Sequence, residues 1–482
     1  MPALFPVTAN YRLCVFGVSL AVFLSACHRR TQEPATPPPT GQAAPSCDTG
    51  LANVETESKA AAPADPEPFR RCFPKDDALS PPRVLSELLA RATEKLDQAG
   101  EDKPVCVGKE LAQKWAQGPL KQALACCDEA LRLDENNVEA LHNRALVCVG
   151  LSRLTEAERA FAHALAADPN DPETLAGAAA FYIHHSAVGT SHTRIGLLHA
   201  RRGAELIRKS LKHRQRSTPP TQAQKNVPDP TQPTLAHGLP PRLSSAKDGG
   251  LQKQLLSRLL LLQGQALVDL GRPKQALGPL DEAIALSDSH QARYERGLLL
   301  FDLCRFKEAE ALFSLLVRRL PEPDNAWSHH QLGLVLEMLG NQTAAEREFA
   351  WAQKLAPEQF RAPLPVSADA FVQLVGQQVA QLPRASLEDL KLVRLELSDL
   401  PLVEDLTVED SPLSPTIVGL FRGLPLGVAG SEPRSIVLYR KNLLRLATTM
   451  EELKMQIRTT LLHELGHVRG EDDDELRDQG LE

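Results

Sequence analysis

The sequence has little of what nucleic-acid-binding proteins and nucleotide-dependent enzymes need. Aromatic residues make up only 4% of its 482 residues, and the formal net charge is −7. Proteins recognise nucleic acids through basic patches and stacking aromatic side chains, so we expect no nucleic-acid partner. The chain also lacks a glycine-rich phosphate loop of the nucleotide-binding types.

The apolar run near the N-terminus, residues 13–24, is too short to span a bilayer. It follows Arg12 and is succeeded by charged, Pro-rich sequence, as in a cleavable export signal. The residues Leu-Ser-Ala before Cys27 resemble a bacterial lipobox. This predicts a signal peptide over 1–26, acylation of Cys27, and a lipid-anchored protein of the bacterial cell envelope, on the outer or inner membrane. The alternative is a retained membrane anchor.

The sequence has nine cysteines but no CxxC pair of the kind that binds metals. Residues 27–82 are rich in Pro, Ala, Thr and Glu, which predicts a flexible tether. Within it, Cys47 and Cys72 either pair in a disulfide after export or stay free. Three further cysteines fall in helical patterns, where cysteine packs as a small apolar residue: Cys126, Cys127 and Cys148.

Small and apolar residues recur in the register of a tetratricopeptide repeat over 83–212 and again over 251–362. The clearest units carry Leu141, Ala145, Cys148, Leu154, Ala157, Phe161, Ala164 and Pro169; Gly264, Ala276 and Ala283; Gly297, Phe306, Ala309, Phe313 and Pro321; and Gly333, Gly340, Ala345, Phe349, Ala352 and Pro357. The polar, Pro-rich residues 213–250 between the two arrays predict a disordered insertion. Stacked repeats form a solenoid, and we expect a protein partner on its concave face.

An HExxH pentad occupies residues 463–467. His463 and His467 are four residues apart, so on a helix they share a face and can bind one metal ion. Glu464 lies beside that position and can take a proton from the attacking water, as in zinc proteases. This predicts a Zn²⁺ site with Glu464 as the catalytic base. The alternative is a pair of partly exposed helical histidines.

A third zinc ligand is expected from the acidic run that follows Gly470. The chain must turn there for another group to reach the open face of the ion. Several side chains have comparable reach: Asp472, Asp473, Asp474, Glu475 and Asp478. Asp473 is favoured, because an inward Leu476 would place it on the same side of a short helix.

Residues 365–482 resemble the small bacterial zincin-like metallopeptidase domains. The resemblance rests on the runs VGLFRGLPL at 418–426, IVLYR at 436–440 and QIRTTLLHELGH at 456–467, followed by the order HExxHxxGxxDxxL. It implies zinc held by His463, His467 and Asp473. One departure is Val468-Arg469, where that family often has a histidine and an aromatic residue.

The zincin-like segment has a mixed pattern. It predicts a helix over 368–382, strands over 390–397 and 435–440, and an active-site helix from near Glu451 to Gly470 with Thr448 or Thr449 as its N-cap. The run 436–439 is the candidate strand for pairing with an extended substrate. Tyr439 is either an oxyanion donor or, in the favoured interpretation, a packing aromatic.

The sequence therefore predicts a multidomain chain, in which an α-helical tetratricopeptide-repeat solenoid precedes a small α+β zincin-like domain. We expect a membrane-anchored zinc metallopeptidase that hydrolyses amide bonds of a peptide or protein substrate. The alternative is a non-catalytic envelope scaffold that binds partners through its repeats. The intact His463, Glu464 and His467 argue against it.

Overall fold

The computed structural model describes residues 81–101, 109–185, 190–217, 249–321, 325–407, 412–428 and 433–481. The predicted signal peptide, the lipidation site Cys27, and Cys47 and Cys72 lie outside the described residues. So do nearly all of the tether and residues 218–248 of the insertion. Among the described helices, none combines the length and the apolar character needed to cross a membrane.

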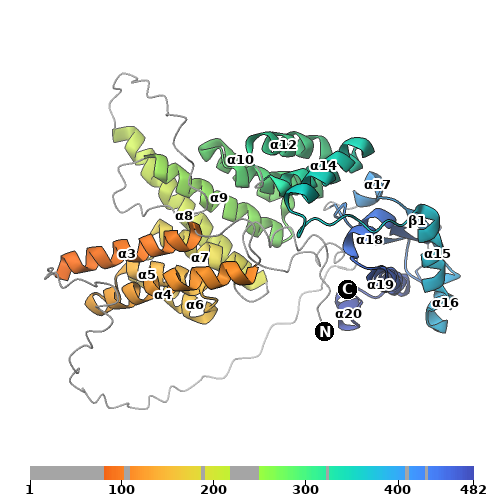
Figure 1. The fold of residues 1–482 in the computed structure, drawn as a ribbon, viewed down its shortest axis with the longest axis horizontal. Coiled ribbons are helices and arrows are strands. Elements are labelled where there is room, and N and C mark those ends of the chain that lie inside the picture. The colour runs from red at the N-terminus through yellow and green to blue at the C-terminus, as the bar shows by residue number, and fades with distance from the viewer. Residues whose placement is uncertain are drawn as a thin grey trace, which may run out of the picture.

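Twelve helices, α3 to α14, pack as consecutive pairs to form the repeat array (Figure 1). Each helix packs on its partner and then on the next pair, which is how a solenoid grows. The pairs are α3 (Pro81–Glu101) with α4 (Lys109–Leu133), α5 (Val138–Gly150) with α6 (Leu154–Ala167), α7 (Pro172–His184) with α8 (Thr190–Ser217), α9 (Gly249–Asp269) with α10 (Pro273–Ser287), α11 (His290–Asp302) with α12 (Phe306–Arg319), and α13 (Ala326–Met338) with α14 (Gln342–Leu355).

The predicted small positions lie where the two helices of a pair approach most closely. A Cβ atom added to Gly297 would come within 2.6 Å of the Phe313 ring, and one added to Gly333 within 2.6 Å of the Phe349 ring. Ala157 and Ala309 are fully buried. The two glycines are small because a phenylalanine ring of the second helix fills the space beside each, and the two alanines occupy close-packed positions on the second helix.

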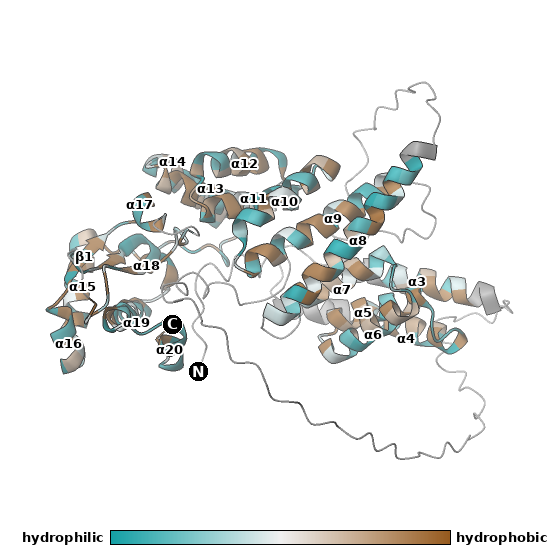
Figure 2. Cartoon of the chain, turned by 180° about the vertical axis from the view of Figure 1, so that it is seen from behind, coloured by the Kyte–Doolittle hydropathy of each residue, from teal (hydrophilic) through white to brown (hydrophobic). Residues whose placement is uncertain are grey.

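The array continues across the predicted insertion. Helix α8 runs to Ser217, so residues 213–217 are helical and not part of a disordered segment as predicted. Gln263 of α9 donates from Nε2 to the Ala200 carbonyl of α8 at 3.1 Å, and Gln252 donates to Ser210 at 3.1 Å. Figure 2 shows hydrophobic residues along α9 and more hydrophilic ones along α8. The buried face of α9 therefore joins the two arrays.

The C-terminal domain is a small α+β unit. It contains α15 (Ala368–Val379), α16 (Arg384–Leu390), β1 (Arg394–Ser398), α17 (Val403–Leu406), β2 (Gly419–Arg422), β3 (Ser435–Tyr439), α18 (Arg440–Leu446), α19 (Met450–Arg469) and α20 (Asp473–Asp478). The strands form one sheet in the order β1-β3-β2, with β1 parallel and β2 antiparallel to β3. Apolar residues of α15, α18 and α19 pack with β3 into one core. The predicted fold class, a helical-repeat solenoid followed by an α+β domain, is confirmed.

The prediction that residues 436–439 pair with substrate is wrong. They belong to β3, the central strand, which bonds β1 on one side and β2 on the other. All five residues of β3 are buried, and a continuous apolar run of this kind is typical of a central strand. Strand β2 lies at the edge of the sheet and contacts α19.

Candidate metal centre

Helix α19 carries the HExxH pentad, and both of its ends are fixed by local chemistry. Thr449 is the N-cap and accepts from the Glu452 N–H at 3.2 Å, while Thr448 donates to the Glu452 carboxylate. Gly470 ends the helix with φ of +95°, a left-handed conformation that favours glycine. The turn at Gly470 sends the chain back toward the two histidines.

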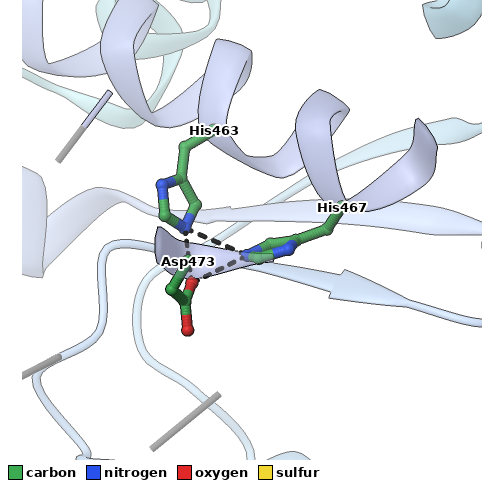
Figure 3. Close-up of side chains that lie close together, drawn as sticks. All are labelled: His463, His467 and Asp473. Atoms are coloured by element: carbon green, nitrogen blue, oxygen red, sulfur yellow. Dashed lines mark hydrogen bonds and ion pairs between the residues drawn. The ribbon is translucent and has the colours of Figure 1, made fainter. Parts of the chain in front are cut away.

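Three candidate ligand atoms converge beside α19 (Figure 3). The Nε2 atoms of His463 and His467 are 3.0 Å apart. Oδ1 of Asp473 lies 3.6 Å from the first and 3.3 Å from the second. Zinc bonds of 2.0–2.1 Å at tetrahedral angles place ligand atoms about 3.3 Å apart. The three separations therefore fit three corners of a zinc tetrahedron, and the donor set is one that zinc prefers.

Helix α20 places Asp473 in this cluster. Leu476 is fully buried and packs against Gly466 of α19, where an added Cβ would come within 2.2 Å of the leucine side chain. Asp473, one turn earlier, is 7% exposed and faces the histidines. The glycine between the two histidines thus lets α20 approach closely enough for its aspartate to reach them.

The other acids of the run lie elsewhere. Asp472 is the N-cap of α20 and forms a capping box with Glu475. Asp474 accepts from Arg477 at 2.6 Å, and Asp478 is exposed. The only His, Cys, Asp or Glu cluster with metal-ligand spacing in the described part of the chain consists of His463, His467 and Asp473.

Two backbone carbonyls orient the imidazole rings. Nδ1 of His463 lies 2.8 Å from the Leu481 oxygen, and Nδ1 of His467 lies 3.0 Å from the Glu471 oxygen. When each Nδ1 carries its proton, both Nε2 atoms are left as metal ligands. We did not predict these contacts. The one sequence feature that could have indicated them is Gly480, which adopts a φ of +74° directly before Leu481.

Glu464 is 6% exposed and faces strand β2. Its carboxylate accepts a hydrogen bond from the Phe421 N–H. A Cβ atom added to Gly419 would come within 2.9 Å of Glu464 Oε1, so this strand position must be small. Burial raises the pKa of Glu464 above its ordinary value, although the nearby imidazoles of His463 and His467 act in the opposite direction.

The electrostatics of His467 favour a bound cation. Burial alone would lower the pKa of its imidazole, but the hydrogen bond to Asp473 and the charge of Glu464 outweigh burial. The pKa of His467 is therefore raised above its ordinary value. The carboxylates around this ring thus stabilise positive charge, whether a proton or a metal ion supplies it.

Tyr439 is a buried residue of the central strand and is not one of the three candidate ligands. Its side chain is fully buried in β3, and burial together with the Asp405 carboxylate raises the pKa of the phenol. Arg422, its neighbour on β2, donates to Asp405 at 2.6 Å and to Glu396 at 3.0 Å. This position agrees with the packing interpretation of Tyr439 and not with an oxyanion donor.

Comparison with known protein families identifies both modules. Residues 390–481 match the zincin-like metallopeptidase family. Residues 114–172 and 261–322 match the tetratricopeptide repeat family. The predicted resemblance and the predicted order, repeats followed by a zincin-like domain, are confirmed. No curated protein sequence matches the chain significantly.

Several solved structures share a distant likeness with this chain. Pseudomonas aeruginosa PilF is 12% identical, with a TM-score of 0.38, and the match covers 58% of this chain and 96% of PilF. PilW, a type IV pilus biogenesis factor, is 19% identical with a TM-score of 0.35, covering 55% of this chain and 96% of PilW. YrrB, a tetratricopeptide-repeat protein with an unusual peptide-binding site, is 17% identical with a TM-score of 0.28, covering 48% of this chain and 93% of YrrB.

Proposed function

We propose that the C-terminal domain is a zinc-dependent metallopeptidase that hydrolyses amide bonds. The observation that carries this proposal is the convergence of His463 Nε2, His467 Nε2 and Asp473 Oδ1 at separations of 3.0, 3.3 and 3.6 Å. These atoms would hold the ion and leave a position open for water and substrate. A zinc ion bound there would supply Lewis acidity and lower the pKa of the attacking water.

Glu464 would act as the general base. It lies one residue after His463 on α19, and its charge interacts with both imidazoles. The carboxylate would accept a proton from the attacking water and pass it to the nitrogen of the leaving amine. Burial raises its pKa above the ordinary value, which makes the carboxylate a stronger base, and the Phe421 N–H restrains the side chain.

Strand β2 is suited to align an extended substrate. It is the edge strand beside α19, and among the described residues only β3 pairs with it. The Val418 carbonyl accepts from the Tyr439 N–H at 2.9 Å, so alternate backbone groups point toward β3. The Phe421 N–H points the other way, toward Glu464, and the strand packs on the same residue at Gly419. A peptide added along this edge would pass the candidate catalytic base.

The repeats would bind a protein partner, because stacked helical pairs create an extended surface that small domains lack. Acylation of Cys27 would tether the protein to a bacterial envelope membrane, outer or inner. We base that part of the proposal on the lipobox-like sequence before Cys27.

The test compares the wild-type chain with Glu464→Gln in a peptide-library cleavage assay and by metal analysis. Glutamine keeps the shape of the side chain and leaves the three ligands in place, so about one zinc per chain should remain. Hydrolysis should fall by at least a factor of 10², because glutamine cannot accept the proton. Equal cleavage by both proteins would refute the catalytic role of Glu464. Absence of cleavage by either would favour the scaffold alternative.

A further inference from the structure

The last helical pair of the solenoid contacts the zincin-like domain through a buried carboxylate. Glu337, near the end of α13, has a side chain that is only 3% exposed. It accepts from Lys441 Nζ at 3.0 Å and from Arg445 Nη2, both on α18. Figure 1 shows α18 on the side of the C-terminal domain that faces α14. The residues that join the two modules are thus more than a hundred positions apart in sequence.

Neighbouring contacts extend this interface. Lys441 also donates to the Gln342 side chain at 2.5 Å, and the Arg445 guanidinium lies 5.2 Å from the centre of the Phe349 ring. Both partners belong to α14. Arg445 and Lys441 are themselves only 13% and 19% exposed. Two cations and one carboxylate held away from water are costly unless each is paired, so this cluster depends on both modules being docked.

Arg445 is also connected by hydrogen bonds to the segment that precedes strand β2, beside the candidate metal centre. Arg445 Nη1 donates to Asn442 Oδ1 at 3.0 Å. Asn442 is buried, and its Nδ2 donates to the carbonyls of Pro415 and Ile417 at 3.0 and 2.7 Å. Two residues after Ile417, strand β2 begins with Gly419, which packs against Glu464. A continuous set of polar contacts therefore joins the last repeat to the edge strand.

We propose that the α13–α14 pair is a docking surface for the zincin-like domain, and that Glu337, through Arg445 and Asn442, holds residues 415–421 in the position that borders Glu464. The partner of this surface is α18 of the same chain. The consequence for substrate alignment rests on the proposed function, whereas the physical coupling does not.

The test is hydrogen exchange of the zinc-loaded full-length chain, comparing wild type with Glu337→Ala. Removal of the carboxylate leaves Lys441 and Arg445 buried without their anion, so the docked state should open more often. Exchange of the amide hydrogens in 415–421, which Pro415 lacks and the other residues carry, should accelerate at least tenfold. Zinc affinity should stay within threefold, because Glu337 contacts none of the three ligands. The matched control is Glu308→Ala, which removes an exposed carboxylate of α12 that pairs with Arg305; its exchange in 415–421 should match wild type.

A second variant, Arg445→Gln, leaves Glu337 paired with Lys441 and removes the link to Asn442. It should also accelerate exchange in 415–421 at least tenfold, and it keeps the test valid should Glu337→Ala fail to fold. If both residues act on one route, the double variant should exchange no faster than the faster single variant. The proposed route would be overturned if the two substitutions multiplied each other's acceleration of exchange in 415–421. It would also be overturned if exchange accelerated only in α13 and α14. Hydrogen exchange does not depend on catalytic activity. A chain that hydrolyses no peptide would therefore refute the proposed function, while the exchange rates would still test the coupling.

Discussion

The Nε2 atoms of His463 and His467 face each other at 3.0 Å, while the Nδ1 atom of each ring contacts a backbone carbonyl. A carbonyl oxygen accepts hydrogen bonds and cannot donate, so both Nδ1 atoms carry protons. In the neutral rings both Nε2 atoms are then acceptors, and they lie beside the Asp473 carboxylate. Such a set of atoms is stabilised by a cation, either a proton on an imidazole or a metal ion, and its spacing fits zinc.

The first prediction concerns the third ligand. Asp473→Ala should weaken zinc binding at least tenfold, because the variant loses the one carboxylate that approaches both Nε2 atoms. Asp474→Ala is the matched control, since Asp474 is exposed and pairs with Arg477. Titration with a competing chelator measures both affinities. Equal affinities for the two variants would remove Asp473 from the ligand set.

The second prediction concerns the carbonyl that orients His463. Gly480 has φ of +74°, so Gly480→Val should strain the backbone and displace the Leu481 oxygen from Nδ1. We expect zinc affinity to fall roughly tenfold, as for other groups that orient metal ligands. Gly271→Val is the control, because Gly271 has a similar φ of +68° in the repeats, also with no atom near the new Cβ. A loss of zinc affinity of the same size in both variants would contradict the prediction.

Sequence reasoning could bring together the three candidate ligands because their evidence is local. His463 and His467 share a helix, and Asp473 follows one turn after Gly470. It misassigned residues 436–439 because the two strands that pair with them, β1 and β2, are distant in sequence, although the continuous apolar run is itself the pattern of a central strand. The contact between Glu337 and Arg445 could not be predicted from the sequence either. Each residue alone is an ordinary helical charge, and only the packing of two modules buries them.

The third prediction concerns packing in the repeats. Ala309 is fully buried in α12, so Ala309→Leu should force its neighbours apart and lower the free energy of unfolding by about 1–3 kcal/mol. Ala311 lies two residues later on the same helix and is exposed, so Ala311→Leu should change stability by less than about 0.5 kcal/mol. Chemical denaturation followed by circular dichroism measures both variants. Equal stabilities would mean that α12 is not packed as described.

The last prediction is a pH dependence that originates in α13. His330 stacks on Phe360 with ring centres 4.7 Å apart, and burial together with the Arg445 charge lowers its pKa to about 3. The unfolded chain binds a proton at this site near pH 6.5, whereas the folded chain does not until the pH is far lower. The contribution to stability is therefore complete above about pH 7 and is lost as the pH falls toward 3.

Between pH 7 and pH 5, His330 should account for a loss of up to about 2 kcal/mol in the free energy of unfolding. His330→Phe keeps an aromatic ring against Phe360 and has nothing to protonate, so its stability should fall less steeply over this interval. His163→Phe is the control, because His163 is exposed and should leave the slope unchanged. Urea denaturation of the three proteins at pH 7, 6 and 5, all with zinc removed by a chelator, measures the slopes. Parallel slopes for wild type and His330→Phe would show that the folded protein protonates His330 as readily as the unfolded chain does.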